Sequence, residues 1–364
     1  MFRQLVAIDR SKLRWGLAAL ALVAIVVCVA LEALTGVGFV QTSIAAVLVV
    51  LTGGKGTLGS RFAYMAIVTV FGGVLGFLAY VTAENAWAAA LVLAVAAYLT
   101  GLAYGISRAA GSAGYLLLCW VLVVLIGQSR DEYPGATSVA FLIGGAIAMA
   151  LVGIVALVTR GRAFPAPLEE PVANAGAGGK ATFGSLVTSD LGIWNLVRAV
   201  LIVFAVVIGY SLTTDLDPYW AAIVLLIVFL PDLGKTMFKA IQRGVGTIVG
   251  VLTATGLIAA FDADPPMIVV MIIGAFGAVA FYSANYMIYA FFLTNAVLSY
   301  YWLAVDHEMS GPGIRIVDTL IGIALAIGGV AIVTLITKRR HAQIAAPHGG
   351  TGSTSSQQAT SADD

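Results

Sequence analysis

The sequence predicts an all-α, polytopic membrane protein of about twelve transmembrane helices, built as two parallel six-helix repeats without a soluble domain. Of its 364 residues, 60% are hydrophobic and only 10% are charged, and the mean hydropathy is +1.01. Soluble domains carry about 25% charged residues, so this composition excludes a soluble globular enzyme. Twelve spans of about 20 residues would use roughly 240 residues and leave only loops, a linker and a tail.

Apolar stretches between polar or Gly/Pro breaks give twelve candidate spans, six in each half of the chain. In the first half they cover residues 13–34, 37–52, 62–82, 86–106, 113–127 and 137–159. In the second half they cover residues 196–214, 218–231, 244–261, 266–283, 287–304 and 316–337. The segments 37–52 and 218–231 are shorter than a full span, which a tilted helix or a locally thinned bilayer accommodates. The first apolar stretch is longer than the core of a signal peptide, so it is expected to be a membrane helix.

Two polar segments divide the chain. Residues 161–194 are rich in Pro and then in Gly and Ala, which is typical of a linker, here expected on the cytoplasmic side. They separate a first membrane unit, residues 1–160, from a second, residues 195–340. Residues 341–364 have low complexity and are expected to be disordered.

The loop charges predict the orientation of the chain. Loops on the side of the N-terminus carry almost all the basic residues, and loops on the other side carry most of the acidic ones. Only Arg130 and Arg315 depart from this pattern, and each has acidic residues nearby. Because the Lys/Arg asymmetry sets orientation, both termini are expected in the cytoplasm.

The two halves of the sequence resemble each other at a fixed offset. PGATSVAFLIGGAIAMALVGIVALVTR from Pro134 aligns without gaps with PGIRIVDTLIGIALAIGGVAIVTLITK from Pro312, and about half of the positions are identical. The offset is 312 − 134 = 178, and the same shift pairs Thr69 with Thr247. Because six spans is an even number, the repeats insert in the same direction. They should therefore be related by a pseudo-two-fold axis along the membrane normal.

The most informative stretch runs from Asp217 to Gly256. Pro218 suits the first turn of a helix, and Tyr219 and Trp220 follow at the level of the interfacial aromatic belt. After a basic segment come Arg243 and Thr247, which share one helix face. Small residues at helical spacing permit close helix approach, and they occur in both halves; the glycines concerned are Gly246, Gly250, Gly72 and Gly76.

This stretch resembles the fusaric acid resistance/aromatic acid exporter family of bacterial inner-membrane proteins. The family pattern has a Tyr-Trp start, an apolar run, Pro-Asp, and then an Arg followed by Gly-Thr-x-x-Gly. GIRIVDTLIGIALA, at 313–326, also resembles the family's Arg-x-x-Asp-Thr-x-x-Gly helix. The resemblance covers about 195–337, and plant aluminium-activated malate channels are similar at the level of the fold. It implies an inner-membrane exporter of small organic anions, with aromatic carboxylates as the substrate class.

The residues of this pattern give a candidate substrate path. Arginine suits a carboxylate because its fork donates two parallel hydrogen bonds, and charges within a membrane usually mark a path, a pair or an interface. Two alternatives stay open: Arg243 anchors its helix at the lipid headgroups, and Arg315 only pairs with Asp318. The candidate path comprises Arg243, Thr247, Arg315, Asp318, Trp220, Tyr219 and Lys239.

The first half departs from this pattern at the polar positions. At the offset of 178, Tyr219-Trp220 correspond to Gln41-Thr42, and Arg243 corresponds to Met65. Arg315 and Asp318 correspond to Thr137 and Ala140. If the polar residues bind substrate, the second half is therefore expected to do most of the work.

No catalytic, cofactor or metal site is expected. Cys28 and Cys119 lie in apolar runs, where a thiol is usually inert, and the three histidines form no cluster. PDLGKT, at 231–236, resembles the end of a phosphate-binding loop, but Phe229 occupies the position of the first glycine.

The expected partners are the lipid bilayer and a small organic anion; no nucleic acid is expected, and the protein could form a homo-oligomer. Three functions remain. They are a coupled exporter, a passive anion channel, and a non-transporting subunit that binds a partner protein.

Overall fold

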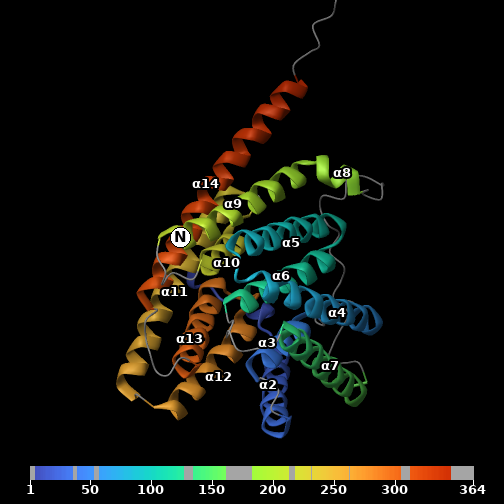
Figure 1. Ribbon diagram of the computed structural model, residues 1–364, viewed down its shortest axis with the longest axis vertical. Helices are drawn as coiled ribbons and strands as arrows, with labels where there is room; N and C mark the ends of the chain where they lie inside the picture. Colours follow the sequence, from blue (N-terminus) through green and yellow to red (C-terminus); the bar gives the residue numbers. More distant parts are fainter. Residues whose placement is uncertain are drawn as a thin grey trace, which may run out of the picture.

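The computed structural model is helical throughout the part of the chain that it describes. The described residues are 5–35, 39–52, 57–126, 134–160, 183–212, 218–230, 232–261, 263–304 and 312–345. Within these ranges every regular element is a helix (Figure 1). The first half holds the short η1 (Arg10–Lys12) and α2 (Trp15–Thr35), α3 (Phe39–Thr52), α4 (Leu58–Thr82), α5 (Ala86–Ile106), α6 (Arg108–Ile126) and α7 (Pro134–Val158). The second half holds α8 (Phe183–Thr188), α9 (Asp190–Leu212), α10 (Pro218–Val228), α11 (Leu233–Phe261), α12 (Asp264–Phe281), α13 (Tyr286–Ala304) and α14 (Pro312–Ala345).

Several helices begin at side chains that cap their free backbone N–H groups. The Asn85 side chain accepts hydrogen bonds from the backbone nitrogens of Trp87 and Ala88, both at 3.1 Å, at the start of α5. Thr57 caps α4 by accepting from the Ser60 nitrogen at 3.4 Å. Such caps satisfy donors that would otherwise lack a partner in the first turn. The sequence therefore specifies these helix starts locally.

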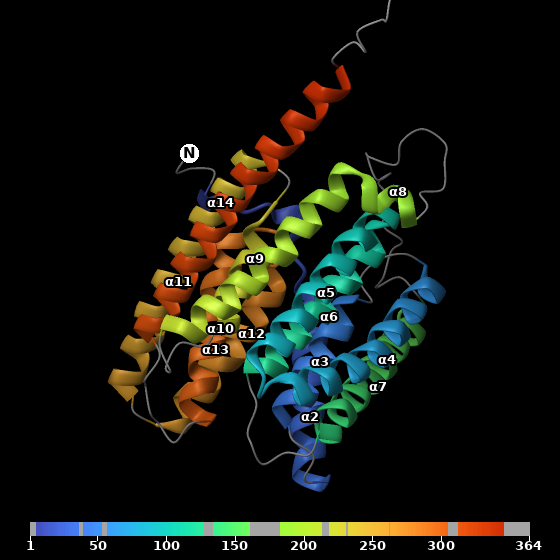
Figure 2. The same cartoon turned by 45° about the horizontal axis from the view of Figure 1, so that its top comes forward.

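Each half forms a compact group of packed helices. In the first half α7 packs against α3 and α4, while α6 packs against α4 and α5, and α2 against α3. In the second half α14 packs against α10 and α11, while α13 packs against α11 and α12, and α9 against α10. The two groups meet where α9 packs against α5 and where α12 packs against α2. Figure 2 shows the long helices α11 and α14 side by side and α4 beside α7.

The N-terminal segment joins the first half to the turn between α12 and α13. The Asn285 side-chain nitrogen donates to the backbone oxygens of Leu5 and Ala7, both at 2.9 Å. The Asp9 nitrogen donates to the Ala284 oxygen at 3.2 Å. Asn285 is buried, and it also caps α13 by accepting from the Ile288 nitrogen at 3.0 Å. These bonds satisfy the polar groups of a turn that would otherwise be buried without partners.

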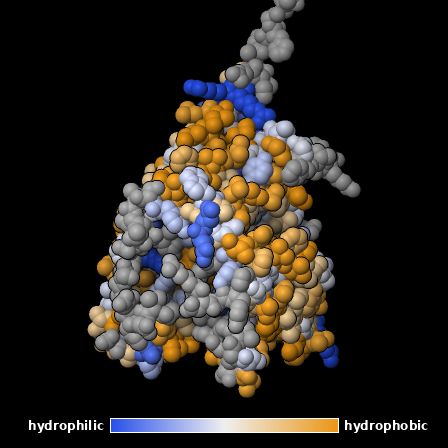
Figure 3. All heavy atoms as spheres, viewed as in Figure 1, coloured by the Kyte–Doolittle hydropathy of each residue, from blue (hydrophilic) through white to orange (hydrophobic). Residues whose placement is uncertain are grey.

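The helices identify a multi-pass membrane protein. In the described part of the chain, nine helices are long and apolar enough to cross a membrane, namely α2, α4, α5, α6, α7, α9, α11, α12 and α14. Apolar side chains also face outward along these helices, as Val70, Phe71, Val74 and Phe77 do on α4. Figure 3 shows apolar residues over much of the visible outer surface. Bilayer contact accounts for such a surface, because soluble proteins rarely expose large contiguous apolar patches.

The remaining three of the twelve expected spans stay predictions. Helices α3 and α10 are apolar but short, in agreement with the lengths of 37–52 and 218–231. Helix α13 carries Asn and several Tyr residues and is not among the nine.

Some helix limits correct those expected from the sequence. Helix α11 begins at Leu233, not near 244, so the basic segment before Arg243 is helical. Helix α14 extends to Ala345, so the first residues of the expected tail are helical. Arg340 and His341 at this end contact the Asp190 carboxylate at 3.3 and 3.0 Å, which ties the extension to the start of α9.

The segment expected as a linker is also partly helical. Helix α8 and the first turn of α9 lie within 161–194. Arg340 donates to the Thr188 oxygen at 2.8 Å, and this bond holds the turn between the two helices. The remainder of the linker, residues 161–182, and of the tail, residues 346–364, lie outside the described residues.

Candidate functional site

A capped turn sets the position of α11, which carries the centre of the site. The backbone nitrogen of Lys235 donates to the Asp232 carboxylate at 2.7 Å, so Asp232 caps the helix. The Thr236 hydroxyl is fully buried; it donates to the Leu230 oxygen at 3.0 Å and accepts from the Leu230 nitrogen at 3.1 Å. The Asp-Leu-Gly-Lys-Thr run therefore forms the capped first turn of α11.

A small buried cavity lies between α10, α11, α13 and α14. The centre of a water-sized sphere can occupy about 20 Å³ of this cavity, so it holds little more than one water molecule. Four residues of the expected path meet there, although they come from three helices. The lining comprises Trp220, Val224, Arg243, Thr247, Leu293, Thr294, Val297, Leu298, Arg315 and Thr319. We refer to this cavity as the arginine cavity.

Arg243 and Thr247 reach the arginine cavity from α11. Each is only 3% exposed. Among the described residues, the Nε and Nη1 atoms of Arg243 and the Thr247 hydroxyl have no hydrogen-bond partner. The Tyr286 hydroxyl lies near the Arg243 guanidinium. Arg243 is therefore enclosed by protein, and both a role in substrate binding and a role as a helix anchor stay predictions.

Arg315 enters the arginine cavity from α14 and stacks on aromatic rings. Its guanidinium carbon lies 3.8 Å from the centre of the Trp220 ring and 4.7 Å from that of Tyr301. Such cation–π contacts hold a guanidinium in place without neutralising it. In the part of the chain that the structure describes, its Nη1 atom and the Trp220 Nε1 atom have no hydrogen-bond partner.

Asp318 is buried close to the arginine cavity but does not line it. It is 2% exposed, and its Oδ2 atom has no hydrogen-bond partner among the described residues. Within the same residues, its carboxylate forms no ion pair with Arg315 at 4.0 Å or less. Arg315 still lies close enough to act electrostatically on this carboxylate, so the alternative in which it pairs with Asp318 stays a prediction.

Residues 191–329 match the family model described as fusaric acid resistance protein-like. The second half carries a fusaric acid resistance protein-like domain. The resemblance expected from the sequence is confirmed over this range, which spans α9 to α13 and much of α14. No curated protein and no solved structure matches the chain. Every residue that lines the arginine cavity belongs to the fusaric acid resistance protein-like domain.

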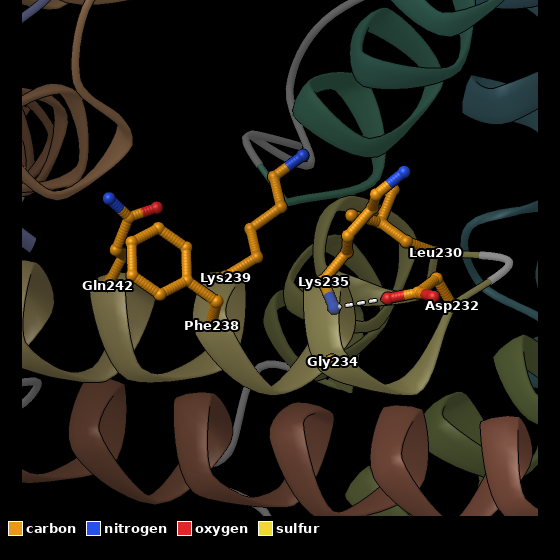
Figure 4. A pocket seen from close by; sticks show the side chains of 7 residues that line it. All are labelled: Leu230, Asp232, Gly234, Lys235, Phe238, Lys239 and Gln242. Atoms are coloured by element: carbon orange, nitrogen blue, oxygen red, sulfur yellow. Dashed lines mark hydrogen bonds between the residues drawn. The ribbon is translucent and has the colours of Figure 1, made fainter. Parts of the chain in front are cut away.

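A second, larger pocket opens at the start of α11 within the same domain. Its volume is about 440 Å³, and it is lined by Leu230, Asp232, Gly234, Lys235, Phe238, Lys239 and Gln242. Figure 4 shows the Lys235 and Lys239 side chains extending to the same side of α11. The Lys239 ammonium group lies 5.0 Å from the centre of the Tyr286 ring. Lys239 therefore belongs to this lysine pocket rather than to the arginine cavity, and Tyr286 lies near both Lys239 and Arg243.

The expected glycine contacts bring α11 against α13. A Cβ atom added to Gly246 would lie 2.5 Å from the Met287 oxygen, and one added to Gly250 would lie 2.7 Å from the Thr294 Cβ. In the first half, side chains of Phe141 and Trp120 fill the space beside Gly72 and Gly76. Close approach of α11 to α13 thus positions Thr294 and Leu298 at the arginine cavity.

The structure also separates residues that the sequence placed together. Tyr219 is buried away from the arginine cavity and contacts Tyr210, with ring centres 6.4 Å apart. Within the described ranges, no three His, Cys, Asp or Glu side chains gather into a possible metal site. Sequence reasoning missed the four α13 residues that line the cavity, because Leu, Val and Thr on a membrane helix resemble ordinary packing. Thr319 could have been found, since it follows Asp318 in the motif that the sequence analysis quotes.

Proposed function

We propose that this protein exports small organic anions, aromatic carboxylates in particular, across a bacterial inner membrane by secondary transport. In this proposal both termini face the cytoplasm, as the loop charges predict. The fusaric acid resistance protein-like match supports membrane transport as the general activity. The arginine cavity supports the choice of an anion as the transported species.

The observation that carries the proposal is the convergence of unpartnered donors in one buried cavity. Trp220, Arg243, Thr247 and Arg315 line it, and each has at least one buried polar atom without a hydrogen-bond partner. Buried donors without partners are rare because each costs about 1–3 kcal/mol. A carboxylate would accept from several of them at once, and arginine binds carboxylates in a bidentate manner. The rings of Trp220 and Tyr301 would offer flat surfaces to an aromatic substrate.

The lysine pocket supports an entry route along α11. Lys239 precedes Arg243 by one helical turn, which corresponds to a rise of about 6 Å. Lys239 and Gln242 line the open pocket, and Arg243 and Thr247 line the buried cavity. A substrate carboxylate could therefore pass from Lys239 to Arg243 without leaving a cationic environment. In the proposed orientation this route begins at the cytoplasmic face.

The helix contacts support two parallel repeats. At the offset of 178, α2–α7 correspond to α9–α14, and the pairs α3–α7, α4–α7 and α5–α6 correspond to α10–α14, α11–α14 and α12–α13, which are also packed. Between the halves, α5 packs against α9 and α12 packs against α2. Because α5 corresponds to α12 and α9 to α2, each of these two contacts is the counterpart of the other. Such reciprocal contacts are the property of an interface with two-fold symmetry. We infer an internal dimer whose axis runs along the membrane normal.

The small size of the arginine cavity favours a gated transporter over an open channel. A volume of about 20 Å³ does not admit an aromatic acid, so side chains must move before substrate enters. The stacked Arg315 is the side chain best placed to act as this gate, because it lines the cavity together with Trp220 and lies against the rings of Trp220 and Tyr301.

Flux measurements in proteoliposomes test the proposal. A labelled aromatic carboxylate is followed with and without an imposed pH gradient, for the natural protein, Arg243→Gln and Lys338→Gln. Lys338 is an exposed cation on α14, so its loss should leave transport unchanged. We expect gradient-driven flux that Arg243→Gln abolishes. Flux independent of a proton gradient would instead favour the passive channel. Absence of flux for a broad panel of organic anions, with a partner protein co-purifying in stoichiometric amount, would favour the non-transporting subunit.

A further inference from the structure

The arginine cavity carries more positive than negative charge. Arg243 and Arg315 contribute two guanidinium groups, and Asp318 is the only described carboxylate buried beside them. Lys239 adds a further cation one turn away, over Tyr286. Guanidinium groups stay protonated even when buried. The described residues therefore leave at least one positive charge without a counter-charge.

A buried positive charge without a counter-charge raises the free energy of the folded protein. Removing an ion from water costs several kcal/mol unless a partner compensates, and charges within membrane helices are normally paired. The aromatic rings around Arg315 attract it but bring no negative charge. The unpartnered Nε and Nη1 atoms of Arg243 point to the same deficit. A bound anion would remove it.

We propose that the arginine cavity binds one small monovalent inorganic anion, a halide such as chloride, which the substrate carboxylate displaces. The binding itself does not depend on transport; only the displacement rests on the proposed function. The ligand atoms would be the unpartnered donors of Arg243, Thr247, Arg315 and Trp220.

The size and the donors of the cavity select this class of ligand. The centre of a water-sized sphere can occupy about 20 Å³ of the cavity, which suits a small, nearly spherical ion and leaves too little room for gluconate or an aromatic acid. A halide accepts hydrogen bonds from all directions and donates none, which matches a cavity rich in N–H and O–H donors. A single negative charge also matches the excess of one that Arg243, Arg315 and Asp318 leave at the cavity, whereas a divalent anion would overcompensate this excess.

Thermal unfolding and tryptophan fluorescence of the purified protein test the inference without transport. The protein in detergent is compared in chloride, bromide, gluconate and sulfate at equal ionic strength. We expect chloride and bromide to raise the unfolding temperature by about 2–4 °C relative to gluconate and sulfate. Bromide should also quench part of the fluorescence in a saturable manner, because Trp220 lies at the cavity.

Matched variants identify the site. Trp220→Phe should remove the saturable quenching, and Thr247→Val should weaken halide binding about five-fold while the protein still folds. Arg243→Gln should abolish the halide effect, and Lys338→Gln should retain it. Equal unfolding temperatures in all four salts, with only linear quenching by bromide, would overturn the inference. A halide effect that survives both Arg243→Gln and Thr247→Val would also overturn it.

The outcome is separable from that of the proposed function. Carboxylate flux without any halide effect would defeat the halide site and leave the exporter standing. Saturable halide binding without carboxylate flux would support the site and defeat the exporter. Competition between the two anions, seen as a carboxylate-dependent loss of bromide quenching, is expected if both proposals hold.

Discussion

The two halves of the molecule differ at the position of the arginine cavity, which the first half fills with aromatic side chains. At the offset of 178, Leu298 and Thr319 of the arginine cavity correspond to Trp120 and Phe141 in the first half. Those two rings lie 4.5 Å apart between their centres, and Trp120 donates from Nε1 to the Gly72 oxygen at 2.9 Å. Met65, which corresponds to Arg243, is fully buried beside them in the main hydrophobic core. The first half is thus filled by apolar side chains where the second holds a small cavity lined by two arginines.

This difference suggests a division of labour within one architecture. Trp120 and Phe141 belong to the large core, which extends into both halves and includes Val224 beside the arginine cavity. On the α11 and α13 side of the cavity, Val251, Ala254 and Leu298 form a small cluster apart from that core. A filled copy gives a rigid frame, and helices that meet through a small, separate cluster can rearrange more easily. We therefore expect motion during transport to concentrate in α11 and α13.

The largest effect on carboxylate binding is expected when Arg243 is replaced by Met, the residue at the corresponding position 65 of the first half. Arg243→Met should weaken carboxylate binding about 100-fold, because a buried charge partner of the substrate is lost. The reciprocal Met65→Arg should create no second site, since Trp120 and Phe141 occupy the space. Equilibrium binding of a labelled aromatic carboxylate checks both variants, and unchanged affinity in Arg243→Met would break the comparison.

The helices were more predictable from the sequence than the site was. Hydrophobic runs located the helices because burial and bilayer contact both demand apolar residues at every span. The start of α11 was placed too late, because Lys235 and Lys239 resembled a loop, while the Asp232 cap and Thr236 start the helix there. Capping depends on local hydrogen bonds that a hydropathy pattern does not contain.

The charged part of the site could be predicted, and its apolar part could not. Arg243 and Arg315 are predicted because charges are rare and costly within spans, and Trp220 and Thr247 because they belong to the family-like pattern. Whether Leu298 lines a cavity depends on the neighbouring helices and not on the residue itself. Tyr219 shows the converse error, since its neighbour Trp220 reaches the cavity while Tyr219 faces Tyr210.

Substitutions that fill or empty the space at this position should affect transport differently in the two halves. Thr319→Phe places in the second half the side chain that Phe141 provides in the first, and it should lower transport at least ten-fold at a cost of about 1–3 kcal/mol in stability. Phe141→Thr should instead leave transport unchanged while costing about 3 kcal/mol through the cavity that it leaves. Flux and unfolding temperature are measured for both variants. Transport lost in Phe141→Thr at a temperature where the protein is folded would contradict the passive role of the first half.

A smaller effect concerns the contact that positions α13. Gly246→Ala should lower the unfolding temperature by several degrees, because the new methyl group would meet the Met287 oxygen and the Ala290 side chain. Gly256 lies on the same helix with no atom within 4 Å of an added Cβ, so Gly256→Ala should be neutral or slightly stabilising. Equal destabilisation by the two substitutions would show that helix propensity, not the α11–α13 contact, decides the result.

The smallest effect is expected from a single neutral donor. Thr247→Val keeps the volume of the side chain and removes one hydroxyl, which contributes about 1 kcal/mol to binding, or about five-fold in affinity. The aligned Thr69→Val should leave affinity unchanged, because the Thr69 hydroxyl donates to the Met65 oxygen at 2.7 Å within α4. Carboxylate titrations of the two variants sharpen the comparison at the level of one atom.

The stoichiometry of carboxylate binding tests the central claim most directly. The second half alone should hold a site, so equilibrium binding to the purified protein should saturate at one aromatic carboxylate per chain and be lost in Arg243→Met. Saturation at two per chain, or one site that persists in Arg243→Met, would contradict the account.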